Sequence, residues 1–278
     1  MLDLMYITNN SEIALIAEKY GVSRIWVDLE TLGKEERQKG MNTVKSHHSI
    51  EDVRQMSKIL TKSELMVRIN PWNRNSIAEI NEVISAGAKR IMLPMWKTFS
   101  EVDMFLKTVN KRVSTTLLLE TREAVECLDE VLEHCLIDEI HIGLNDLHLS
   151  YGLTFMFELL TNGIVEALCA KMQRKGIKYG FGGIACIGEG LLPAEKIVME
   201  HKRLGSTRAI LSRGFCPLEN KSINEIKKEF FKKTEELYAF EKKLVNTSEI
   251  EFKRNILSIK ECVNQIVEMK QGEKQCVV

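Results

Sequence analysis

Short apolar runs alternate with amphipathic segments along most of the chain. The runs are continuous in hydrophobicity, as expected of parallel strands covered on both faces. A polar loop and then apolar residues at helical spacing follow each run. The runs begin at Leu4, Arg24, Leu65, Arg90, Thr115, Glu139, Ile177 and Arg208. Such a series of strand–helix units favours a closed (β/α)8 TIM barrel, with an open doubly wound sheet as the alternative.

Residues typical of helix ends occur between these runs. Ser49 with Asp52, and Ser100 with Asp103, match the capping box, in which a hydroxyl and an acid three residues later satisfy backbone N–H groups. Glycine is common just beyond a helix, where the backbone turns left-handed. The glycines in such places are Gly21, Gly87 and Gly205. These signals predict where several of the helices begin and end.

The pattern changes after about Pro217, where the chain becomes charged, helical and almost free of glycine and proline. We expect residues 1–245 to form the barrel with its last helix, and residues 246–278 to form an additional C-terminal helix. An apolar stripe on this helix predicts packing on the barrel or on a neighbouring subunit. Its members are Leu257, Ile259, Val263, Ile266 and Val267.

Composition narrows the classes of partner. Lys and Arg together number 39, as do Asp and Glu, and this balance argues against nucleic acid or a membrane surface as a partner. No apolar run reaches the roughly 18–20 residues of a membrane helix, and the first residues lack the basic start of a signal peptide. The seven cysteines are scattered without a C-x-x-C pair. We expect a cytoplasmic protein with free thiols.

Polar residues gather where the predicted strands end, and in a parallel barrel these ends carry the active site. They are Asp28, Glu30, Arg68, Glu120, Asn145 and Asp146. Carboxylates so close together repel unless a cation separates them, and all-oxygen ligands favour Mg²⁺ or Mn²⁺ over zinc. We therefore expect Glu120 and Asp146 to bind the metal and Asn145 to contact the substrate. Each acid taken singly has the ordinary alternative role of a helix cap or a solvated charge.

Arg68 and two histidines are candidates for catalysis. A buried arginine needs partners, and those of Arg68 are either an inward salt bridge to Asp28 or Glu30, or a substrate carboxylate held by its planar fork. His47 and His48 end a long polar loop after the second strand. Either is a candidate general base, and the alternative is that both are exposed residues in front of a helix.

One glycine motif does not indicate a nucleotide site. Residues 180–185 match G-x-G-x-x-[GA], and Glu200 follows at about the right distance. A dinucleotide site needs these glycines to open a helix directly, and here a further loop intervenes. We interpret the motif as a glycine-rich strand end that lets substrate approach the backbone.

Five stretches carry a resemblance to a known family. IWVDLET, MVRINPWN, AGAKRIMLPM, LLLETREAV and IDEIHIGLNDLHLSYG follow one another over about residues 24–152. They resemble the HpcH/HpaI aldolase/citrate lyase family, within the phosphoenolpyruvate/pyruvate barrel superfamily. The two most specific stretches are LETREA and GLNDL. The resemblance places the family's metal-binding acids on Glu120 and Asp146.

The resemblance also implies an activity. It implies metal-assisted cleavage or formation of a carbon–carbon bond through a pyruvate-type enolate, with a 2-oxo acid or an acyl-CoA ester as substrate. The pyruvoyl-binding arginine of the family falls on Arg68, and its acidic motif falls on Asp28 and Glu30. Proteins of this family usually form homo-oligomers, so a homo-oligomer is expected here.

Two departures from the family keep other functions open. The aldolase branch has a histidine after the second acid of the strand 2 motif, where this chain has Thr31, although His47 or His48 can substitute from the loop. The segment between strands 4 and 5 is also shorter than in the aldolases. The alternatives are a mutase or hydrolase of phosphoenolpyruvate-like compounds, and a catalytically degenerate barrel that serves as a binding or assembly subunit.

Overall fold

The chain folds as a closed barrel of parallel strands. The structure, a computed structural model, describes residues 1–33 and 48–275. Eight strands follow one another around the barrel in chain order, from β1 to β8. This order confirms the predicted (β/α)8 barrel and rules out the open doubly wound sheet. The chain divides into two compact units, residues 4–140 and residues 1–3 with 141–278, and each is described separately.

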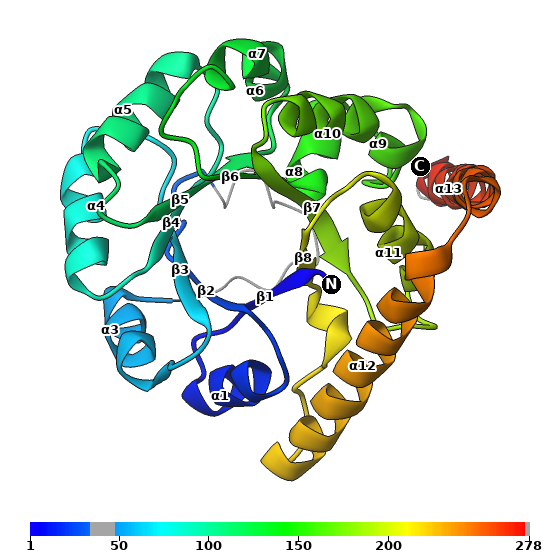
Figure 1. Cartoon of the computed structure of the whole chain (residues 1–278), viewed down its shortest axis with the longest axis horizontal. Coiled ribbons are helices and arrows are strands. Elements are labelled where there is room, and N and C mark those ends of the chain that lie inside the picture. The colour runs from blue at the N-terminus through cyan, green and yellow to red at the C-terminus, as the bar shows by residue number, and fades with distance from the viewer. Residues whose placement is uncertain (34–47, 276–278) are drawn as a thin grey trace. The chain divides into compact units, whose positions relative to one another are not determined.

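The unit of residues 4–140 contains the first five strands and the start of the sixth. Its strands are β1 (Asp3–Ile7), β2 (Arg24–Asp28), β3 (Glu64–Arg68), β4 (Arg90–Leu93), β5 (Ser114–Leu119) and β6 (Glu139–Ile142). Its helices are α1 (Ser11–Lys19), α3 (Ile50–Ile59), α4 (Ser76–Ser85), α5 (Phe99–Val109), α6 (Arg122–Glu126) and α7 (Leu128–Val131). Helices α1, α3, α4 and α5 lie outside the strands (Figure 1).

A buried ionic network joins the strands of this unit near their amino ends. Arg24 donates from Nη1 to Glu139 Oε1 and from Nε to Glu64 Oε2, both at 2.8 Å. Arg90 donates from Nε to the same Glu64 oxygen, also at 2.8 Å. The Thr116 hydroxyl donates to Glu139 Oε1 at 3.1 Å. Because buried charges are tolerated only when they are paired and hydrogen-bonded, this network strongly constrains the strand register.

The helix-end predictions hold with one exception. Ser49 and Asp52 form the capping box of α3 as predicted. The capping box of α5 is formed by Thr98 and Glu101, so the prediction of Ser100 and Asp103 is wrong by two residues. Asp103 instead accepts a hydrogen bond from Lys107 at 2.8 Å. The three glycines predicted beyond helix ends do follow α1, α4 and α11, with φ of 91°, 106° and 67°.

The other unit contains the last strands and the longest helices. Its strands after β6 are β7 (Lys178–Ile184) and β8 (Arg208–Leu211). Its helices are α8 (Leu144–Ser150), α9 (Glu158–Thr161), α10 (Ile164–Arg174), α11 (Ala194–Arg203), α12 (Ile223–Lys243) and α13 (Glu249–Gln275), with short 3-10 turns η1 (Arg213–Phe215) and η2 (Leu244–Asn246). Within the described ranges, even these helices lack an apolar stretch of the length that a bilayer crossing requires.

The additional C-terminal helix predicted from the sequence is α13, which packs against α9 and α11 (Figure 1). Ile259, Val263 and Ile266 are buried as predicted, but Leu257 is 63% exposed and does not belong to the packed face. Two hydrogen bonds help to fix the position of the helix. The Asn255 amide donates to the carbonyl of Lys196 at 3.0 Å and to Glu200 Oε1 at 3.1 Å.

We predict that Glu139→Ala lowers the free energy of unfolding by about 3–5 kcal/mol, because Arg24 then lies buried without one of its two carboxylate partners. Urea unfolding followed by circular dichroism measures the change. Glu133→Ala, which removes an exposed carboxylate from the same unit, is the control and should stay within about 0.5 kcal/mol of the parent. Equal stability of both variants would show that the network does not stabilise the barrel.

Candidate active site

The centre of the site is an ion pair between two neighbouring strands. Asp28 and Arg68 are the last residues of β2 and β3 and lie opposite each other in the register. Arg68 donates from Nε to Asp28 Oδ1 and from Nη2 to Asp28 Oδ2, both at 2.8 Å. Glu30 Oε2 lies 3.3 Å from the same Nε. The predicted salt bridge therefore exists, and it occupies one edge of the planar fork that was also predicted to hold substrate.

The guanidinium of Arg68 is contacted on its flat face by an aromatic ring, in addition to the carboxylate on its edge. The ring of Trp26, two residues before Asp28 and on the same side of β2, lies 4.9 Å from the guanidinium carbon. Sequence analysis missed this contact. The alternation of side chains along a strand is the signal that connects positions 26 and 28.

Charge at the site is balanced around Arg68. Burial lowers the pKa of Arg68, but the carboxylate of Asp28, followed by those of Glu30 and Glu120, raises it further than burial lowers it. Arg68 is therefore always charged and is the counter-ion of the neighbouring buried carboxylates. This arrangement brings four sequence-predicted site residues into one electrostatic cluster, which we call the Arg68 cluster: Asp28, Glu30, Arg68 and Glu120.

The carboxylate of Glu120 is held by the loop after β4. Glu120 follows β5 directly and is only 3% exposed. Its Oε1 accepts the backbone N–H of Met95 at 3.0 Å. Met95 has a φ of 52°, a left-handed conformation that is strained for a residue with a side chain. Next to it, the Thr121 hydroxyl donates to the carbonyl of Trp96 at 2.7 Å. These two bonds tie the end of β5 to the β4 loop and fix the orientation of Glu120.

Of the two loop histidines, only His48 lies within the described residues; His47 lies outside them. His48 is half-buried, and its Nδ1 accepts the backbone N–H of Asp28 at 2.9 Å. In the neutral ring the proton is therefore on Nε2. His48 thus contacts the acidic end of β2, in contrast to the alternative of an exposed residue in front of α3.

Thr31, where the resemblance implies a histidine, has a structural role. Its backbone N–H and its hydroxyl donate to Asn70 Oδ1 at 2.9 and 3.2 Å. The amide of Asn70 in turn donates to Glu79 Oε1 at 2.9 Å. This chain of bonds joins the end of β2 to α4, and it supplies no group that titrates near neutral pH at position 31.

Asn145 and Asp146 belong to the other unit, where both lie in the first turn of α8. Asn145 is exposed and Asp146 is half-buried. His141, within β6, is fully buried, and its Nε2 lies 3.3 Å from the carbonyl of Gly182. His148 is also buried, with Nδ1 at 3.2 Å from the carbonyl of Leu144. Both histidines thus make structural contacts, His141 in β6 and His148 in α8, the helix that carries Asp146.

The glycine motif of residues 180–185 lies mostly within β7 and opens no helix, which agrees with the rejection of a dinucleotide site. Its glycines permit close packing. A Cβ at Gly180 would lie 2.3 Å from the carbonyl oxygen of Arg208, and one at Gly182 would lie 2.7 Å from Leu144. The motif therefore allows β7 to approach β8 and α8.

Comparison with known proteins places this chain in one family. The model of the family described as HpcH/HpaI aldolase/citrate lyase matches residues 4–160, which include Glu120 and Asp146. The chain therefore belongs to the HpcH/HpaI aldolase/citrate lyase family, as the resemblance predicted. The description of this family names aldolases and lyases, so a lyase-type function is supported. No curated protein matches the chain in sequence.

Solved structures are similar in fold at low identity. An HpcH/HpaI aldolase from Desulfitobacterium hafniense DCB-2 is 14% identical, with a TM-score of 0.60 over 76% of this chain and 86% of that one. A family protein from Burkholderia cenocepacia J2315 is 13% identical, with a TM-score of 0.59 over 76% and 87%. The citrate lyase beta subunit from M. tuberculosis, complexed with oxaloacetate and magnesium, is 13% identical, with a TM-score of 0.57 over 82% and 96%.

We predict that Arg68→Leu destabilises the protein by about 3–5 kcal/mol at pH 8, because it leaves Asp28 and Glu30 buried without their counter-ion. Protons that neutralise the uncompensated carboxylates relieve this cost, so the variant recovers stability as it binds protons. Its deficit relative to the parent should therefore shrink as the pH falls from 8 to 5 in urea unfolding. Arg122→Leu, at an exposed ion pair on α6, should show neither effect. A deficit independent of pH would contradict the assigned role of Arg68.

Proposed function

We propose that this protein is a divalent-metal-dependent carbon–carbon lyase that acts on a 2-oxo acid or an acyl-CoA ester through a pyruvate-type enolate. The observation that carries the proposal is the Arg68 cluster, a set of buried charges at the carboxyl ends of β2, β3 and β5. In barrels of this type the strand ends on that face carry the chemistry. Oxaloacetate and magnesium in the citrate lyase beta subunit support the same class of ligand and ion.

The donor set fits a hard divalent ion. Glu120 and Asp146 offer carboxylate oxygens, which Mg²⁺ and Mn²⁺ prefer. Among the residues that the structure describes, no cluster of three or more His, Cys, Asp or Glu side chains is arranged to hold a metal. Mg²⁺ commonly binds through one or two carboxylates and takes its other oxygens from water and substrate. When bound, the ion supplies positive charge that stabilises negative charge developing on a substrate oxygen.

Arg68 binds the carboxylate of the substrate in this proposal. Its described partners, Asp28 and Glu30, all contact Nε or Nη2. The substrate carboxylate would therefore meet the opposite edge, which includes Nη1. Asp28 and the Trp26 ring hold the guanidinium plane in advance, so little side-chain freedom is lost on binding. Asn145 is exposed at the start of α8, and its proposed role is to donate a hydrogen bond to the substrate.

Proton transfer falls to the histidine pair at the end of the loop after β2. His48 already contacts the β2 end, and its Nε2 carries the proton in the neutral ring, so it is suited to donate a hydrogen bond there. To accept a proton on Nδ1 it would have to release the N–H of Asp28. His47 is therefore the second candidate for the base.

One observation favours a second candidate function. Thr31 is tied to Asn70 and provides no imidazole where the aldolase branch has one. This favours a barrel that keeps ligand binding but has lost turnover, serving as a binding or assembly subunit. The metal titration below separates ligand binding from catalysis, and the histidine variants test catalysis itself.

We predict that metal-stripped protein binds Mn²⁺ in isothermal titration, and that bound Mn²⁺ tightens the binding of oxalate, a mimic of the enolate. Glu120→Gln and Asp146→Asn should each weaken Mn²⁺ binding at least about tenfold, because each removes a charged ligand. Glu126→Gln, with an exposed carboxylate on α6, is the matched control and should bind like the parent. If Glu120→Gln binds Mn²⁺ as tightly as the parent does, the metal assignment is wrong.

We predict that the double variant His47→Ala, His48→Ala lowers kcat for a substrate by about 10²–10⁴-fold, the usual contribution of a general acid or base. His48→Asn retains an acceptor for the Asp28 N–H but lacks the titratable imidazole. This variant therefore distinguishes the loss of proton transfer from a distortion of the end of β2. Oxalate affinity, measured alongside, should change little. Unchanged turnover in the double variant would remove both histidines from the mechanism.

A further inference from the structure

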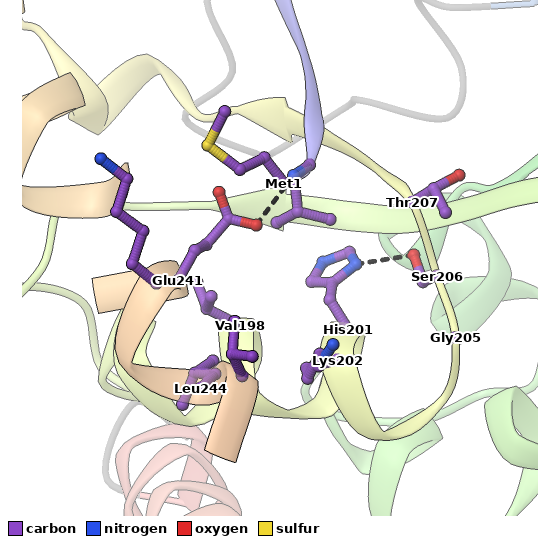
Figure 2. Close-up of a pocket in the computed structure, with 12 residues that line it drawn as sticks. Met1, Val198, His201, Lys202, Gly205, Ser206, Thr207, Glu241 and Leu244 are labelled. Carbon is purple, nitrogen blue, oxygen red and sulfur yellow. Dashed lines mark hydrogen bonds between the residues drawn. The ribbon is translucent and has the colours of Figure 1, made fainter. Parts of the chain in front are cut away.

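A cavity of about 260 Å³ lies in the unit of residues 1–3 and 141–278, apart from the residues assigned above (Figure 2). The last turns of α11 and α12 form part of its wall, together with the residues before β1 and β8 and the turn η2. Val198, Leu2 and Leu244 supply an apolar surface. The polar residues of the wall include His201 and Glu241, which face the opening from opposite sides in Figure 2.

His201 presents an acceptor nitrogen. The residue is 1% exposed, and its ring stacks on Phe181 with 3.8 Å between centroids. Nδ1 lies 2.7 Å from the hydroxyl oxygen of Ser206, and that oxygen lies 3.5 Å from the carbonyl oxygen of Arg208. With the ring proton on Nδ1 and donated to Ser206, Nε2 carries a lone pair. Nε2 is buried and has no hydrogen-bond partner within the described part of the chain. Burial, followed by the charge of His141, lowers the pKa of His201 to about 3, so the ring is neutral.

Glu241 presents a second acceptor. Its Oε1 accepts the backbone N–H of Leu2 at 2.8 Å. Its Oε2 is buried and lacks a hydrogen-bond partner among the residues described. Burial raises the pKa of Glu241, while the N–H of Leu2, the terminal ammonium group and Lys202 oppose the rise. A cation beside Oε2 would satisfy the oxygen and favour the ionised carboxylate.

The cavity therefore combines unsatisfied acceptors with an apolar wall. The helices α11 and α12 both end here, and the carbonyl end of a helix carries partial negative charge. A ligand that donates several hydrogen bonds and carries positive charge fits these groups. Lys202 and Lys242 also line the cavity and are exposed, so each offers a positive charge to an anionic group of the same ligand.

We propose that this cavity binds a small aliphatic ammonium compound, with the ammonium group between Glu241 and His201 and the aliphatic part against Val198, Leu2 and Leu244. An alkylamine and an α-amino acid share this chemistry. They differ in the carboxylate, which only the amino acid can offer to Lys202 and Lys242.

Isothermal titration of the full chain with isobutylamine, L-valine and isobutyrate tests the proposal. Isobutylamine and L-valine should bind saturably, and isobutyrate, which lacks the ammonium group, should not. Tighter binding of L-valine than of isobutylamine identifies the amino acid as the class, and the reverse order identifies the amine. The proposal is overturned if neither ammonium compound binds, or if isobutyrate binds as well as they do.

Three variants locate the binding. Glu241→Gln should weaken isobutylamine binding at least about tenfold, as loss of a charge-assisted hydrogen bond does. Glu235→Gln, with an exposed carboxylate on the same helix, is the control and should bind like the parent. Val245→Trp, at a 70% exposed position of the wall, should block the cavity without disturbing the core. Thermal melts establish that each variant is folded. Unchanged affinity in Glu241→Gln or in Val245→Trp would place the binding elsewhere and overturn the proposal. The result is independent of the Mn²⁺ titration.

Discussion

The burial of several carboxylates beside one arginine is the constraint on which the candidate site depends. Asp28, Glu30 and Glu120 are almost completely buried at the ends of their strands, where an isolated carboxylate would take up a proton. Arg68 lies next to these carboxylates and supplies a positive charge that does not titrate. The same side chain therefore stabilises the fold and defines the electrostatic character of the site. Its replacement should affect both, and the pH dependence of stability distinguishes the two roles.

The strand register links the two ends of this part of the barrel. Pairing of β2 with β3 sets Arg24 opposite Glu64 at one end and Asp28 opposite Arg68 at the other. Because side chains alternate along a strand, a shift of one residue would turn both ion pairs away from their present face. The ionic network near the amino ends thus helps to hold the register that places Asp28 and Arg68 together. Fold stability and site geometry depend on the same pairing.

Several features of the site arise from contacts between loops, and no motif in the sequence predicts these contacts. The strained backbone of Met95 points its N–H at Glu120, and His48 accepts a bond from the backbone of Asp28. Neither requires a particular residue type that a motif would reveal. The misplaced capping box of α5 has a similar cause, because Thr98 and Ser100 are both competent caps, and the position of Glu101 decides between them. When two neighbouring residues are equally suited to cap a helix, only the surrounding structure decides which of them does so.

The sequence by itself determined the barrel, the glycine-terminated helices, the polar strand ends and the family. These features follow from hydrophobic periodicity and from residues, such as glycine at a helix end, that favour one local structure. Neighbouring positions in the sequence therefore suffice to predict them. The tertiary structure alone decided that Asp28 occupies one edge of Arg68, that Trp26 covers its face, and that Leu257 points away from the packed side of α13. The cavity beside His201 and Glu241 is likewise formed only by the tertiary structure. The physical reason is that partner choice among charged and aromatic side chains depends on distances between residues far apart in the chain, which periodicity does not encode.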